Sequence, residues 1–265
     1  ILRRMQSAYP QIRLVEQENA GLSLAREKGA EAASGDYLWF VDADDCIAPD
    51  ALCVLTDFLS EQPDVLCLQA QTLGNPAIRN ALPTGFTHGM ALLSDNLFED
   101  CVPFYVYRRA FLQQHGLHFF PGIYHEDAEF TPRMLFAARK VAVCPKVLYF
   151  VYPDPQSLAR LPKVKLSYDL VKVAENLHAF RVTHSMTKGA QASFSHRISK
   201  ALNNALSIIC KFDRREQQDF NAFMYAHREV LSELSFSFPK YRVEYVLFRL
   251  FPKHNVQMYR LLKRI

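Results

Sequence analysis

The sequence predicts an α/β fold, in which buried strands form a sheet and helices cover both of its faces. Residues 38–41 and 64–70 are short apolar runs with β-branched or aromatic members, typical of strands buried inside a sheet. Residues 21–34 and 49–60, on either side of the first run, have the apolar spacing of helices. With 265 residues, 49% hydrophobic and 22% charged, the chain can form one large domain or one domain with an appendage.

The elements around this core follow from local patterns. Residues 2–9 are predicted to be the end of a helix that Pro10 closes, and residues 11–16 alternate as a short strand. Pro49 lies in the predicted first turn of its helix, where its fixed backbone is favourable. Residues 73–89 contain Gly, Asn and Pro and are predicted to form a loop.

The helix predicted over residues 21–34 has a narrow face of small side chains. That face consists of Leu22, Ala25, Gly29 and Ala32 or Ala33. Small side chains allow a helix to lie close to a sheet, so we expect this face to pack there. Gly35 follows the helix and fits the left-handed backbone position of a C-terminal cap.

The predicted strand 38–41 ends in three carboxylates, Asp42, Asp44 and Asp45. Carboxylates this close repel one another, and a divalent cation or a hydrogen-bond network would relieve the repulsion. In an α/β sheet, ligands bind at the carboxyl ends of strands. An alternative is purely structural, with Asp42 and Asp44 forming a turn and Asp45 capping the helix near Pro49. Taken alone, this stretch fits both interpretations.

The residues before the carboxylates favour a ligand site. Residues 18–29 have the sequence E-N-A-G-L-S-L-A-R-E-K-G, and residues 35–45 have the sequence G-D-Y-L-W-F-V-D-A-D-D. This resembles the family 2 glycosyltransferases, whose pattern is E-N-x-G-x-S-x-A-R-N-x-G, then a helix, then G-(D/E)-Y, an apolar run and D-x-D-D. Glu27 departs from it, since the family usually carries Asn there.

The resemblance implies a GT-A-like sheet that binds a nucleotide-diphospho-sugar donor. It places Asn19, Arg26, Asp42 and Asp44 at the nucleotide. Asp44 would bind a metal ion, and Asp42 the metal or the ribose; hard oxygen ligands suit Mg²⁺ or Mn²⁺. For Arg26 the alternative is a surface ion pair with Glu27 or a neighbour.

A second part of the resemblance lies further along the chain. Residues 101–112 resemble the family's strand followed by Y-(R/K)-(R/K)-x-F-L, and residues 124–127 (Y-H-E-D) match its E-D pair, whose Asp is the general base. Asp127 would then be catalytic, in the first turn of a helix whose buried face includes Phe130 and Met134. The alternative is an ordinary acidic helix start. His125 is either a metal ligand or a hydrogen-bonding neighbour.

Two short strands are predicted around Pro145, over residues 141–143 and 148–151. Residues 152–158 resemble the family's Y-R-x-N-x-x-S-I loop near the phosphates, which implies a phosphate contact for Ser157. The Arg and Asn of that loop are absent here.

The chain becomes helical after Lys163, so we expect a catalytic domain over residues 1–160, lacking the family's first strands, and a C-terminal helical region over 161–265. Two apolar stripes in that region are predicted to be packing surfaces. Their residues are Phe194, Ile198, Ala201, Leu202, Ala205, Ile208, Ile209 and Phe212, then Phe220, Phe223, Met224, His227, Val230, Leu231 and Leu234.

The tail, residues 239–265, contains Glu244 as its single acid among seven Lys and Arg residues. Basic residues interleaved with aromatic and aliphatic ones suit an interfacial segment on an anionic membrane. A solvated helix packed on the helical region explains the pattern equally well.

The resemblance implies an inverting, metal-dependent glycosyltransferase that adds a sugar to a glycan or lipid-linked acceptor in surface polysaccharide or lipid-linked oligosaccharide synthesis. The Q-x-x-R-W motif of processive synthases is absent, and the single Trp is Trp39. Six cysteines without metal-ligand spacing indicate core thiols, and therefore a protein of the reducing cytoplasm. If the tail binds lipid, the protein lies at the inner face of the cell membrane. A net charge of +4 without a recognition motif gives no reason to expect nucleic acid.

Two further interpretations remain open. Family members carry a strand, a helix and a second strand before the point matched by Ile1, and these supply much of the uracil and ribose site. We therefore expect a fragment, with a catalytically inactive remnant or binding module as the alternative. A nucleotidyltransferase would also use a metal at an α/β sheet, but no Gly-rich phosphate loop bearing Lys or Arg is visible.

Overall fold

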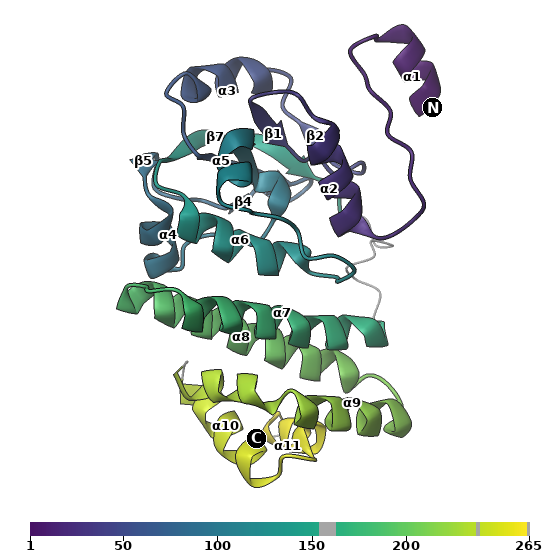
Figure 1. The fold of residues 1–265 in the computed structure, drawn as a ribbon, viewed down its shortest axis with the longest axis vertical. Helices are drawn as coiled ribbons and strands as arrows, with labels where there is room; N and C mark the ends of the chain where they lie inside the picture. Colours follow the sequence, from purple (N-terminus) through teal and green to yellow (C-terminus); the bar gives the residue numbers. More distant parts are fainter. Residues whose placement is uncertain (154–162, 237–238, 264–265) are drawn as a thin grey trace.

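The computed structural model describes residues 1–153, 163–236 and 239–263. A sheet lies at one end of the elongated molecule and layers of helices extend from it to the other end (Figure 1). The described residues form a seven-stranded sheet. Its strands are β1 Tyr37–Trp39, β2 Cys46–Ile47, β3 Val65–Thr72, β4 Ile78–Arg79, β5 Gly85–Thr87, β6 Tyr105–Arg108 and β7 Val141–Val151.

The strand order is β1-β6-β3-β7-β2, with β4 added beside β3 and β5 beside β7. The central strands β3 and β7 are parallel, and the other pairs are antiparallel. In β3, Val65 and Cys67 face one core and Leu66 and Leu68 the other, all fully buried. A strand enclosed on both faces is what its continuous apolar sequence predicts.

Helices cover both faces of the sheet, so the predicted α/β class is confirmed. Helix α3 (Ala51–Leu59) covers one face, where Leu55 packs with Leu66 and Leu68. Helices α4 (Gly89–Asp95) and α6 (Glu126–Ala137) cover the other, through residues such as Leu93 and Met134. The elements of this part are α1 Leu2–Ala8, α2 Leu22–Ala32, α3 Ala51–Leu59, α4 Gly89–Asp95, the 3₁₀ helix η1 Val102–Phe104, α5 Arg109–Gln114 and α6 Glu126–Ala137.

The C-terminal helices stack beneath α4 and α6 (Figure 1). They are α7 Val164–Thr183, α8 Lys188–Ile209, α9 Arg214–Ala226, the 3₁₀ helix η2 Arg228–Phe236, α10 Pro239–Leu250 and α11 Asn255–Leu262. Both predicted apolar stripes are packing surfaces, with Phe194, Ile198, Phe220 and Met224 completely buried. One continuous core joins them to the α4–α6 face of the sheet, so the two parts share their interior.

Several predicted elements are wrong. Residues 11–16 pair with no strand among the described residues, and residues 73–89 contain the short strands β4 and β5 instead of a plain loop. The two strands predicted around Pro145 are one strand, β7. An irregularity in its pairing with β3 falls where Pro145 is exposed, and there a residue without an N–H is tolerated.

The surroundings of β1 also differ from expectation. In β1 only Leu38 is buried, and Val41 lies beyond the strand and is exposed. Helix α2 buries Ser23 and Arg26 instead of its small-residue face. Gly35 does not have the left-handed conformation, because Ala33 ends the helix in an extended one. Of the cysteines, all six are free thiols, but Cys46 and Cys53 are exposed and not core residues. Among the described residues, no helix combines the length and apolarity needed to cross a bilayer.

Candidate active site

The turn after β1 is fixed by hydrogen bonds to β7. The Asp45 N–H donates to the carbonyl oxygen of Asp42 at 3.1 Å, and the Tyr149 hydroxyl donates to Asp45 Oδ2 at 2.7 Å. The Asp42 N–H donates back to the Tyr149 hydroxyl oxygen at 3.1 Å, and Asp45 Oδ1 accepts from the Tyr152 N–H. Asp45 therefore orders the turn. The helix-cap alternative for Asp45 is wrong, since the residue at the N-cap of α3 is Asp50.

This arrangement leaves two carboxylates at the turn for a ligand. Asp44 is exposed and forms no hydrogen bond or ion pair with another described residue, whereas Asp42 is 35% exposed. Within the described ranges, no group of three His, Cys, Asp or Glu side chains is arranged to hold a metal ion. Two carboxylates fit a Mg²⁺ or Mn²⁺ ion whose other ligands are water and phosphate oxygens, but they do not form a complete protein cage.

Arg26 links this turn to a second acidic segment. Its guanidinium donates to Asp42 Oδ1 at 2.9 Å and to Glu126 Oε1, and its side chain is only 7% exposed. Burial alone would lower the pKa of Arg26, but the carboxylates of Glu126 and Asp42 raise it. The surface-pair alternative for Arg26 is wrong, because its partners are not on α2 and the residue is buried.

Glu126 and Asp127 begin helix α6, after His125 in the left-handed conformation. Burial raises the pKa of Glu126, which Arg26 counteracts. Burial, followed by the charge of Glu126 and that of Asp100, raises the pKa of Asp127 to about 8. Asp127 Oδ1 accepts from the Ala128 N–H at 2.8 Å. A carboxyl group with such a pKa binds a proton near neutral pH, the property required of a general base.

Other predicted residues take different places. Asn19 is exposed, and its Oδ1 accepts from the Gly21 N–H at 3.2 Å, so the contact it makes shapes the turn before α2. His125 has a buried Nε2 without a hydrogen-bond partner among the described residues, and burial lowers its pKa. Ser157 lies outside the described residues.

The small-residue face of α2 opens onto a groove of about 420 Å³. Ala25, Gly29 and Ala33 line one side of it, and the segment from Leu38 to Ala43 lines the other. Arg26 and Asp42 also border the groove, so it leads directly to the carboxylate turn. The small residues thus leave space beside the site instead of packing against the sheet.

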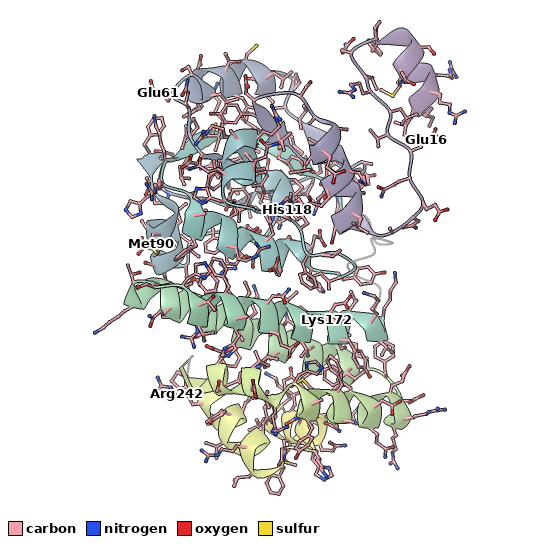
Figure 2. All side chains as sticks on the ribbon, in the orientation of Figure 1. Glu16, Glu61, Met90, His118, Lys172 and Arg242 are labelled. Carbon is pink, nitrogen blue, oxygen red and sulfur yellow. The ribbon has the colours of Figure 1, made fainter. Side chains whose placement is uncertain are left out.

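Sequence reasoning missed three supports of the site. Glu27 accepts hydrogen bonds from the Phe119 N–H at 2.6 Å and pairs with His118, so it fixes the loop between α5 and α6 that Figure 2 marks at His118. Trp39 Nε1 donates to the carbonyl oxygen of Pro103 at 2.9 Å. Glu27 departs from the family pattern and Trp39 lies in its apolar run, so neither position has a role in the motif. Glu126, by contrast, belongs to the E-D pair found in the sequence.

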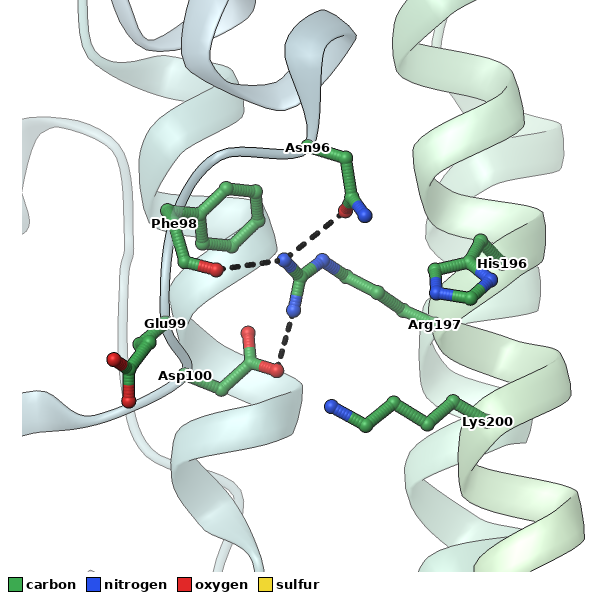
Figure 3. Close-up of a pocket in the computed structure, with 7 residues that line it drawn as sticks. All are labelled: Asn96, Phe98, Glu99, Asp100, His196, Arg197 and Lys200. Carbon is green, nitrogen blue, oxygen red and sulfur yellow. Dashed lines mark hydrogen bonds and ion pairs between the residues drawn. The ribbon is translucent and has the colours of Figure 1, made fainter. Parts of the chain in front are cut away.

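The third support comes from the helical region. Arg197 on α8 extends to the loop after α4, where it donates to Asp100 Oδ2, to the Phe98 carbonyl at 3.1 Å and to Asn96 Oδ1 at 3.2 Å (Figure 3). Its guanidinium lies 3.6 Å from the centre of the Phe98 ring. Asp100 is one of the charges that raise the pKa of Asp127, so α8 holds a group that acts on the candidate base.

Comparisons with known proteins show what the chain is similar to. Residues 1–116 match the model of the family described as Glycosyl transferase family 2. The chain is 31% identical over 166 residues to the uncharacterized glycosyltransferase YibD of Escherichia coli (strain K12), across 58% of this chain and 48% of YibD. It is 29% identical over 163 residues to the uncharacterized glycosyltransferase EpsJ of Bacillus subtilis (strain 168), across 57% of this chain and 47% of EpsJ. The chain thus spans about half the length of these relatives.

Solved structures share the fold. The crystal structure of S. aureus TarS 1-349 in complex with UDP-GlcNAc superimposes with a TM-score of 0.74 at 17% identity, over 99% of this chain and 78% of that one. The TarS 1-349 complex with UDP gives a TM-score of 0.68 at 18% identity, over 99% and 77%. The mixed sheet with its helices is therefore the GT-A fold. Over residues 1–116, which contain α2, β1 and the carboxylate turn, the chain is similar to glycosyltransferase family 2.

Proposed function

We propose that this protein transfers a sugar from a nucleotide-diphosphate donor to an acceptor hydroxyl and inverts the anomeric configuration. The observation that carries the proposal is the Arg26 bridge, which ties the Asp42–Asp44 turn to the start of α6, where Asp127 lies. A donor site and a proton acceptor thereby belong to one fixed unit. The TarS structures with UDP-GlcNAc and UDP support a nucleotide-sugar donor for this fold.

In the proposed reaction, Asp127 accepts the proton of the acceptor hydroxyl as its oxygen bonds to the anomeric carbon. The bond from that carbon to the diphosphate oxygen breaks, and the diphosphate leaves on the opposite face. A single displacement inverts the configuration. Asp44 and Asp42 would hold Mg²⁺ or Mn²⁺, which when bound neutralises charge on the diphosphate. Arg26 fixes the orientation of Asp42 through its hydrogen bond at 2.9 Å.

For the acceptor, we propose a glycan or lipid-linked oligosaccharide of surface polysaccharide synthesis. The protein would work in the cytoplasm, at the inner face of the cell membrane and in peripheral contact with anionic lipid. The basic C-terminal segment supports this location.

The test uses the chain within its full reading frame, a panel of sugar nucleotides, and Mg²⁺, Mn²⁺ or EDTA. We expect slow donor hydrolysis or transfer with either metal, lost with EDTA and reduced at least 100-fold in Asp127→Asn and Asp44→Ala. Asp57→Asn, an exposed change on α3, is the matched control. Donor binding without turnover would indicate a binding module instead, and pyrophosphate release from a nucleoside triphosphate would indicate a nucleotidyltransferase.

A further inference from the structure

Helix α10 packs on the helical region and still presents an apolar stripe to solvent. Tyr241 and Phe248 are buried against the neighbouring helices. On the opposite side Val243, Val246 and Leu250 are 52%, 54% and 66% exposed. Their spacing of three and four residues places them on one line along the helix. The sequence predicted either packing on the helical region or an interfacial segment. In the structure α10 packs through one side and leaves an apolar stripe exposed on the other.

The exposed charged residues of α10, of α11 and of the segment between them have one sign. Glu244, the single acid of residues 239–265, is 3% exposed and accepts a hydrogen bond from Asn203. Arg249 and Lys253 are exposed beside the stripe, and Arg242 lies on the same helix (Figure 2). On α11, Arg260 and Leu261 are exposed, and so is Lys263, the residue that follows the helix. We define the basic–apolar face as Arg242, Val243, Val246, Arg249, Leu250 and Lys253.

We propose that the basic–apolar face docks on the surface of an anionic lipid bilayer. Aliphatic side chains flanked by cations match the boundary between acyl chains and acidic headgroups. A second copy of the chain fits less well, because pairing two such faces would bring cations against cations. This inference assigns a surface and a lipid class to the membrane contact proposed above, and it does not depend on sugar transfer.

The location of the face agrees with this role. Helices α10 and α11 form the end of the molecule opposite the sheet, with α7 and α8 between them and the site (Figure 1). Docking through this face therefore covers neither the groove beside Asp42 nor the start of α6. The acceptor and donor routes to the carboxylates stay open while the protein is bound.

The test is flotation of the purified protein with vesicles of phosphatidylcholine alone and with vesicles containing 30 mol% of the anionic lipid phosphatidylglycerol, roughly the anionic content at which surface charge attracts basic segments. We expect binding to the anionic vesicles, weakened by salt and nearly absent on neutral ones. Val246→Asn with Leu250→Asn should weaken binding about tenfold or more, because the apolar contact is lost. Arg249→Gln with Lys253→Gln should weaken it by about fivefold for each charge removed.

Two changes on exposed residues elsewhere serve as matched controls. They are Leu52→Asn on α3, where Leu52 is 68% exposed, and Lys146→Gln on β7. Both variants should bind vesicles like wild type. Circular dichroism and thermal unfolding confirm that each variant is folded. Absence of binding to anionic vesicles overturns the proposal, as does equal binding by the Val246/Leu250 variant. A dimer in solution that this variant dissociates, without vesicle binding, assigns the face to a second copy. Transfer to a soluble acceptor should stay unchanged in the face variants, so membrane docking and catalysis are judged separately.

Discussion

Arg26 and Asp42 are joined by a hydrogen bond of 2.9 Å between a buried guanidinium and a half-buried carboxylate, sixteen residues apart. The other arm of the same guanidinium contacts Glu126, one hundred residues further along the chain. The bridge therefore connects α2, the turn after β1 and the start of α6. Its strength decides how rigidly the donor and acceptor sides of the proposed site are held together.

The first prediction concerns this bridge. Arg26→Met leaves Glu126 buried without its cation, so we expect a loss of about 3–5 kcal/mol in the free energy of unfolding. Arg26→Met with Glu126→Gln removes both charges and should recover most of the loss. Arg3→Met, in the exposed pair with Glu16, is the control and should cost at most about 1 kcal/mol. Denaturant unfolding measures all three, and equal losses in the single and double variants would contradict the buried-pair account.

The sequence could predict the local parts of this site. The motif around residues 35–45 predicted a strand next to a carboxylate turn, and the E-D pair predicted a helix that begins there. Both are present, although the strand ends at Trp39, before the turn. These predictions succeed because strand, turn and helix start are encoded by neighbouring residues. The predicted roles of Asp42, Asp44 and Asp127 rest on the family resemblance and stay predictions.

The parts that failed depend on distant partners. Which face of α2 is buried is decided by Glu126 and Asp42, which attract Arg26 inward, and helical periodicity cannot encode that choice. The position of Asp45 is decided by Tyr149, more than one hundred residues away. Residues 11–16 alternate like a strand, but alternation alone does not supply a neighbouring strand to pair with.

The second prediction concerns the pH dependence of catalysis. A general base must be ionised, and the pKa of Asp127 is about 8. We therefore expect kcat/KM to rise with pH and level off above about pH 8, instead of near pH 5 as for an ordinary Asp. Asp100→Asn removes a charge that raises this pKa and should move the inflection to lower pH. Asp57→Asn should leave it unchanged. A profile that is flat from pH 6 to pH 9 in wild type would contradict a general base with a pKa of about 8.

The third prediction concerns the pH dependence of stability. The pKa of Asp127 is raised on folding from an ordinary 3.8 to about 8, so the folded state binds this proton more tightly than the unfolded chain. The contribution of this proton to the stability of the folded state is fully present below about pH 4 and is lost as the pH rises through about 8. Relative to Asp127→Asn, wild type should become less stable between pH 5 and pH 9. Denaturant unfolding of both proteins at pH 5, 7 and 9 measures the difference, and parallel pH profiles would refute the raised pKa.

The fourth prediction compares two glycines. Gly89 begins α4 so close to α6 that a Cβ atom there would overlap the backbone carbonyl of Leu135. Gly29 lies inside α2 with no atom within 4 Å of an added Cβ, beside the groove. Gly89→Ala must separate two packed helices, so we expect a loss of about 1–3 kcal/mol in the free energy of unfolding. Gly29→Ala should gain about 0.5–1 kcal/mol, because alanine is the better helix former and nothing obstructs it. Thermal and denaturant unfolding of the pair measure both changes, and a stable Gly89→Ala protein would show that α4 and α6 do not approach as closely as the structure has them.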